Sequence, residues 1–263
     1  ARYNNIFNNT INITGNFGRG IQFHDYTSNN TIFNNYLIID NTEKGSAIRL
    51  ILSSYNNTFY NNNIYSEDNG INLNGTGGSI SNNYFINNSI ICNGNLCNDI
   101  VLTANTTNNF FINTSFNKSK VVFIPRSPPF PAEINNMTIS WYLTINISNS
   151  SGQPIPAQVI INDSNSRNIL NDTFNLRTIE VVEYTQNGSA TWGQNDSCIG
   201  MKSIHNITCF APFNVSINHT EYNPNSTSID LNRSRLVNLF MGILGGAPPP
   251  ADPCTCPASG NFE

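Results

Sequence analysis

Charged residues in the first half of the chain could carry acid–base chemistry, which needs a carboxyl pair or a cluster of Asp, Arg and Lys facing one groove. The candidates are His24, Asp25, Asp40, Arg49, Glu67, Asp68 and Asp99. They fall at different offsets in the repeat described below, so we interpret them as solvated turn residues that are not stacked in adjacent coils. The neighbours His24 and Asp25 could form an acid–base pair, whereas His205 and His219 are expected at the surface. The sequence therefore predicts no catalytic residue, no cofactor and no metal site.

Six cysteines in a chain of this composition indicate an oxidising compartment, where disulfides form and persist. They are Cys92, Cys97, Cys198, Cys209, Cys254 and Cys256. The first two bracket the sequence NGNL and can close a small loop, and the next two span a predicted hairpin. The last two, in PCTCP, are too close for an easy mutual disulfide, so they are expected to pair elsewhere or with another chain. A zinc site is the weaker alternative, because no second pair and no histidine lies nearby.

The motif Asn-x-Ser/Thr, called a sequon here, is the acceptor of N-linked glycans and occurs 21 times. Between residues 136 and 232 it takes in 12 of 16 asparagines, against roughly 3 expected from the Ser and Thr content. In residues 1–135 the share is 9 of 32, and three of these, Asn8, Asn87 and Asn113, fall in a column expected to face inward. Dense N-glycosylation is predicted at the remaining acceptors: Asn12, Asn29, Asn56, Asn74, Asn105, Asn117, Asn136, Asn146, Asn149, Asn162, Asn171, Asn187, Asn195, Asn206, Asn214, Asn218, Asn225 and Asn232.

The composition describes a chain that is long enough for a sizeable core but poor in charge. Only 11% of its 263 residues are charged, the net charge is −4, and about a fifth of the residues are asparagine. Nucleic-acid binding is not expected, because there is no basic patch. The chain contains no run of 18 apolar residues, so no membrane span is predicted. No signal peptide is visible, so a processed or trimmed N-terminus is expected.

A repeat of about 26 residues organises residues 1–124. Its anchors are Asn4, Asn30, Asn57, Asn83 and Asn109. Apolar residues follow each anchor after two and after seven positions, and between them lies a uniform asparagine column: Asn8, Asn34, Asn61, Asn87 and Asn113. Short alternating segments separated by Asn or Gly turns are typical of β-strands and too short for amphipathic helices.

Units of this length cannot bury their own apolar stripe, so they must stack on copies of themselves as a parallel β-solenoid of about five coils. Asparagine suits the corners because it tolerates the left-handed backbone region, and an inward Asn ladder can satisfy buried turn amides. The phrases YNNIFNNTINI, SNNTIFNNYLIIDN and SNNYFINNSII resemble the right-handed parallel β-helix repeat family, particularly the Asn-rich versions of archaeal surface proteins. That resemblance covers residues 1–124 and implies a fold shared with polysaccharide-cleaving enzymes such as pectate lyases.

A different pattern follows the repeat. The sequence PRSPPFPAEI predicts a stiff linker at residues 125–136, because proline fixes its own backbone and restricts the residue before it. Alternating strands follow over residues 137–244. The segments WYLTINISNSSGQPIPAQVIIND and TQNGSATW resemble prealbumin-like or Ig-like β-sandwich modules, such as the carboxypeptidase-regulatory type, which space, stiffen or adhere. The Pro- and Cys-rich tail, residues 245–263, is expected to be extended, and either packs on its own domain or docks into a neighbouring subunit.

Together these features predict an all-β extracellular structural protein, an N-glycosylated subunit of a filament, sheath or surface layer. The first repeat begins at once, with Ile6 already in the apolar column, so an uncovered strand edge is expected there. End-to-end or tail-mediated self-association would cover that edge. The alternative is a carbohydrate-active β-helix, that is, a lyase, a hydrolase or a glycan-binding adhesin. A cleft with clustered carboxylates and basic residues would support this alternative.

Overall fold

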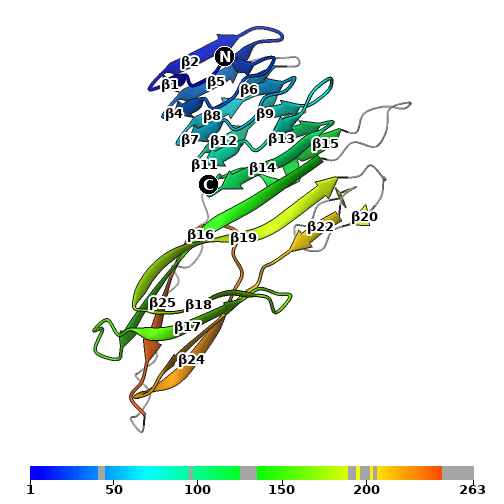
Figure 1. Ribbon diagram of the computed structural model, residues 1–263. Coiled ribbons are helices and arrows are strands. Elements are labelled where there is room, and N and C mark those ends of the chain that lie inside the picture. The colour runs from blue at the N-terminus through cyan, green and yellow to red at the C-terminus, as the bar shows by residue number, and fades with distance from the viewer. Residues whose placement is uncertain are drawn as a thin grey trace, which may run out of the picture.

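The computed structural model describes residues 1–40, 45–94, 97–124, 135–188, 194–195, 202–203 and 206–244. Within these ranges nearly all regular structure is β-strand, and the single helix is the three-residue 3-10 helix η1 (Lys118–Lys120). The predicted all-β fold is confirmed: a β-solenoid of about five coils is followed by a β-sandwich (Figure 1). No helix in the described part of the chain is long and apolar enough to cross a membrane.

Three parallel sheets form the sides of the solenoid, each built from one strand of successive coils. The first sheet contains β1 (Asn5–Phe7), β4 (Thr31–Phe33), β7 (Thr58–Tyr60), β11 (Tyr84–Ile86) and β14 (Thr106–Ile112), with β10 (Ile80–Ser81) also paired to β14. The second contains β2 (Thr10–Thr14), β5 (Tyr36–Asp40), β8 (Asn63–Ser66) and β12 (Ser89–Cys92). The third contains β3 (Arg19–Phe23), β6 (Ser46–Ile51), β9 (Asn69–Asn74), β13 (Asn98–Thr103) and β15 (Val121–Ile124).

Like residues stack on like residues inside the solenoid. In the first sheet Ile32 pairs with Phe59, Phe59 with Phe85, and Phe85 with Phe111, and all four side chains are fully buried. The three phenylalanine rings lie 4.8 and 4.7 Å apart, centroid to centroid, and nearly parallel. Since side chains alternate between the two faces of a strand, the apolar positions of the repeat all fall on the inner face. The period of the sequence is therefore the period of the core.

The asparagine column at Asn8, Asn34, Asn61, Asn87 and Asn113 was predicted to face inward, and this prediction is wrong by one residue. All five have positive φ, between 47° and 56°, and the first four are exposed while the last is half-buried. Asparagine is favoured at such positions because it tolerates the left-handed conformation. In that conformation the bend directs the side chain outward and returns the next residue to the interior.

The inward ladders are formed by two other columns. One consists of the repeat anchors Asn4, Asn30, Asn57, Asn83 and Asn109; the other consists of the residues after the outward column, Asn9, Asn35, Asn62, Asn88 and Thr114. Along both, the backbone N–H of one member donates to the side-chain oxygen of the member in the next coil. Asn62, fully buried, also donates its Nδ2 to Asn88 Oδ1 and to the Ile32 carbonyl, both at 3.0 Å. The ladders thus supply the partners that buried amides require.

The solenoid continues directly into the sandwich through β16 (Asn135–Asn149). Its first half pairs in parallel with β14, as a further strand of the first sheet, and its residues 135–146 pair antiparallel with β19 (Leu176–Gly188). Figure 1 shows both strands passing the last coil and running on into the sandwich. The expected linker lies mostly outside the described residues, and its last two residues, Asn135 and Asn136, are already the first two of β16.

The sandwich packs this extended sheet against a second one. The long sheet gains β22 (Asn206–Cys209) beside β19 and β25 (Arg235–Met241) beside β16, while β20 (Gln194–Asn195) and β21 (Lys202–Ser203) pair separately. The second sheet has the order β18 (Asn168–Phe174), β17 (Ala157–Asn162), β23 (Phe213–His219), β24 (Tyr222–Ile229). Its inner residues Val159 and Val215 belong to the same buried cluster as Leu143 of β16. The tail, with the docking expected of it, lies outside the described residues.

Candidate functional site

Four of the candidate acid–base residues lie where the second sheet of the solenoid turns into the third. They are Asp40, Glu67, Asp68 and Asp99, and we call this set the acidic corner. Asp40 is the last residue of β5, and Glu67 directly follows β8, whose Ser66 pairs with Ile39. Asp40 and Glu67 are therefore neighbours in adjacent coils. The expectation that none of the candidate acids stack is wrong for this pair, because their separation of 27 residues equals one coil.

The Asp40–Glu67 contact is a hydrogen-bonded carboxyl pair at the surface. The pKa of Glu67 is raised, first by the side-chain hydrogen bond with Asp40, then by the charge of Asp40, and last by burial. Two adjacent carboxyl groups resist double ionisation and can hold one proton between them. Such a pair can donate and accept a proton. No group of three or more His, Cys, Asp or Glu in the described residues is arranged to bind a metal ion.

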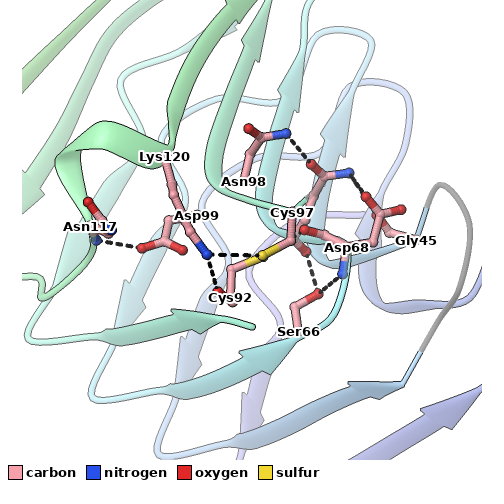
Figure 2. The surroundings of a disulfide bond; sticks show 10 residues. Gly45, Ser66, Asp68, Cys92, Cys97, Asn98, Asp99, Asn117 and Lys120 are labelled. Atoms are coloured by element: carbon pink, nitrogen blue, oxygen red, sulfur yellow. Dashed lines mark hydrogen bonds between the residues drawn. A yellow bond between two sulfur atoms is a disulfide. The ribbon is translucent and has the colours of Figure 1, made fainter. Parts of the chain in front are cut away.

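The other two acids of the corner lie beside a disulfide, where Asp99 is buried and Asp68 is half-buried (Figure 2). Asp68 accepts from Asn69 Nδ2 at 2.7 Å, and Asp99 Oδ2 accepts the Asn117 backbone N–H at 2.5 Å. Burial raises the pKa of both carboxyl groups, and for Asp99 the charge of Lys120 partly offsets this effect. Lys120 Nζ donates to the Cys92 carbonyl oxygen at 2.5 Å. The contacts of Asp99 and Lys120 join the fourth coil to the fifth, and that of Asp68 lies within its own turn, so both acids serve the turn structure.

The remaining predicted candidates lie apart from the corner. His24 Nδ1 is 2.7 Å from Asp25 Oδ2 in an exposed turn, so the two residues do make contact. Arg49 is half-buried on β6, where burial, and secondly the charge of Arg19, lowers its pKa. His219 packs its ring edgewise on Tyr222 in the sandwich, and His205 lies outside the described residues.

One predicted disulfide is confirmed. Cys92 and Cys97 are bonded across the short loop that leaves β12 (Figure 2). Cys209, the last residue of β22, is disulfide-bonded as well. The predictions for Cys198, Cys254 and Cys256 fall outside the described residues.

The sequon asparagines occupy the surface. Of the 21, the side chains of Asn187, Asn195 and Asn206 lie outside the described part, and none of the other 18 is buried. Ten are exposed: Asn8, Asn12, Asn56, Asn87, Asn117, Asn171, Asn214, Asn218, Asn225 and Asn232. Eight are half-buried: Asn29, Asn74, Asn105, Asn113, Asn136, Asn146, Asn149 and Asn162. The reason given above for setting aside Asn8, Asn87 and Asn113 as acceptors therefore does not hold.

The buried asparagines form the complementary set. Within the part of the chain that the structure describes they are Asn30, Asn35, Asn57, Asn62, Asn83, Asn88, Asn109 and Asn135, and none of these lies in a sequon. In the solenoid the residue two positions after a ladder asparagine belongs to the core, as Ile32 follows Asn30 and Phe59 follows Asn57. A Ser or Thr hydroxyl is excluded there, so the ladder and the sequons cannot coincide.

A cavity of about 520 Å³ lies where the solenoid meets the sandwich, and none of the candidate acids lines it. Its lining includes Lys118, Trp141, Arg233 and Arg235, which the sequence analysis did not select. These residues come from three distant segments. The available signal was the dense pair of arginines in NRSR, in a chain that has only 12 cationic residues.

Comparison with known proteins finds no matching protein family, no matching curated sequence and no matching solved structure.

Proposed function

We propose that this protein is an extracellular structural glycoprotein, a subunit of a filament, sheath or surface layer. The observation that carries the proposal is the division of asparagines just described: the sequon members that the structure describes reach the surface, and the ladder members from the second coil onward are buried. Twelve of 16 asparagines between residues 136 and 232 are acceptors, so glycans would coat the sandwich most densely. Sugars at these positions would supply the solubility that a charge content of 11% does not.

The proposed mechanical role rests on the continuity of one sheet from the solenoid into the sandwich. The first sheet runs from β1 through β14 into β16 and β19. A bend at the junction would break the backbone hydrogen bonds that pair β14 with β16, so the solenoid and the sandwich would act as one stiff unit. The repeat part would be of the Asn-rich type common in archaeal surface proteins, and the second part a prealbumin-like or Ig-like spacer. Its partners would be further copies of the chain, and neither nucleic acid nor a membrane is needed.

Electron microscopy of the protein isolated from its native surface without denaturation tests this function. Regular fibres or sheets with density protruding at the sequons of the sandwich are expected. Dispersed monomers without added density would refute the proposal.

The second candidate, a carbohydrate-active enzyme, is favoured by the Asp40–Glu67 carboxyl pair alone. It would require Glu67→Gln to abolish cleavage of a polysaccharide that the unchanged chain degrades. A screen of acidic and neutral polysaccharides that yields no cleavage would leave the structural function standing.

A further inference from the structure

The cavity between the solenoid and the sandwich has a preformed wall around Ser234. It is lined from the solenoid by Asn113, Ser115, Phe116 and Lys118, and from the sandwich by Trp141 and residues 232–235. Ser234 holds the two sides together, because its hydroxyl donates to Asn113 Oδ1 at 2.7 Å and accepts the Tyr142 backbone N–H at 2.8 Å. The wall around Ser234 is therefore fixed before any ligand binds.

Positive charge dominates the lining. Lys118, Arg233 and Arg235 are three of the 12 cationic residues in a chain of net charge −4, and no carboxylate among the described residues lines the cavity. Lys118 is neutralised by an ion pair with the buried Glu183, whose other oxygen accepts the Trp141 indole N–H at 2.5 Å. The two arginines form no salt bridge within the described residues, and Arg235 donates only to a backbone carbonyl, that of Asp230. Two guanidinium groups thus remain available to an anion.

The rest of the lining suits a sugar ring. Trp141 and Phe116 offer apolar surface, while Ser115 and Asn232 offer a hydroxyl and an amide. The volume falls within the usual range for sites that bind small molecules, about 300 to 1,000 Å³. Guanidinium groups recognise carboxylates through two parallel hydrogen bonds, which an ammonium group does not provide.

We propose that this cavity binds an acidic sugar, a pyranose that carries a carboxylate, as one or two units of a polysaccharide. Arg233 and Arg235 take the carboxylate, the aromatic side chains contact the ring, and the polar side chains take its hydroxyl groups. The inference does not rest on the structural function proposed above, since it requires neither assembly nor glycosylation. Two sequon asparagines, Asn113 and Asn232, lie in the lining, so a glycan attached to either would compete for the same space.

The test uses the full chain produced without N-glycans in an oxidising compartment, where disulfides form. Galacturonate and glucuronate disaccharides are titrated by calorimetry against the matching neutral disaccharides and against inorganic phosphate. Binding of a uronate disaccharide at least about tenfold tighter than binding of its neutral match is expected, because only the uronate engages the arginines. Equal affinity for both sugars overturns the proposal, and so does phosphate binding as tightly as the uronate, which would indicate a simple anion site.

Variants locate the binding. Arg233→Gln with Arg235→Gln is expected to weaken uronate binding at least about tenfold. Both arginines are exposed, so the thermal unfolding midpoint should hardly change. Arg177→Gln is the matched control, because Arg177 is an exposed arginine of the sandwich, paired with Asp172, that does not line the cavity. Uronate affinity that the double variant leaves unchanged, or that the control reduces equally, refutes the assignment.

Discussion

Replacing Asn62 with alanine tests the inward ladder at a position where every polar atom of the side chain has a partner. Asn62 Oδ1 accepts the backbone N–H and the Nδ2 of Asn35, both at 3.0 Å. Its own Nδ2 donates to Asn88 Oδ1 and to the Ile32 carbonyl. Alanine removes all four bonds from a site that is fully enclosed.

The expected cost follows from which groups lose their only partner. The backbone N–H of Asn35 is left without an acceptor, which costs about 1 to 3 kcal/mol in a buried site. The Asn35 side chain keeps its bonds to the Ile6 and Phe33 carbonyls. The two donations made by Asn62 Nδ2 contribute about 1 kcal/mol more in net terms. We therefore expect the free energy of unfolding to fall by about 3 kcal/mol.

Urea unfolding of the unglycosylated full chain, followed by circular dichroism, measures this change. Asn61→Gly is the matched control, because Asn61 is exposed with φ of 53° and glycine adopts that conformation freely. The control should change the free energy of unfolding by no more than about 0.5 kcal/mol. If Asn62→Ala costs no more than Asn61→Gly, the ladder does not stabilise the solenoid and the reasoning is refuted.

Three further predictions concern the Cys92–Cys97 disulfide, the buried Asp99 and two glycines. Replacing Cys92 and Cys97 together by serine should cost about 2 kcal/mol of unfolding free energy, as a short closed loop implies; equal urea midpoints with and without the bond would contradict this. Because burial raises the pKa of Asp99, its deprotonation opposes folding, so stability should fall as pH rises from the ordinary carboxyl range through the raised value. Asp99→Asn should reduce that fall in unfolding curves taken at several pH values, and an unchanged pH profile would disprove it. In Gly94→Ala the added Cβ would overlap a backbone carbonyl of the neighbouring coil, so thermal unfolding should show a loss of about 1 to 3 kcal/mol. Gly242→Ala is the control and should be nearly neutral, because its added Cβ meets nothing closer than 3.9 Å. Similar losses from both variants would show that the coils are not so closely stacked.

The solenoid could be predicted because one period controls both the strands and the core. The position of the ladder could not be read so easily, because Asn-Asn doublets place two asparagines at each bend, as in Asn8-Asn9 and Asn87-Asn88. The fifth coil holds the clue. There the doublet is Asn113-Thr114: the outward residue with positive φ remains asparagine, and the inward one becomes threonine, whose hydroxyl donates to the Phe85 carbonyl at 2.7 Å.

One of the two candidate sites could be located from the sequence, and the other could not. The Asp40–Glu67 pair was accessible from the sequence, since a spacing of 27 residues is one coil, as between Asn30 and Asn57. The cavity was not, because its lining joins the last coil, β16 and residues 232–235 at the start of β25, and no periodic pattern relates them. The fusion of solenoid and sandwich through β16 was hidden for a related reason: proline-rich residues precede that strand and indicate a linker.

Site-resolved mass spectrometry of glycopeptides from the native protein tests the central claim most directly. The account predicts glycans on sequons across the sandwich, Asn171, Asn214, Asn218 and Asn225 among them, because these side chains are exposed. It also predicts glycans on outward solenoid positions such as Asn87. Peptides that carry only unmodified asparagine at these sites would contradict the claim that the sequons mark a glycosylated extracellular surface.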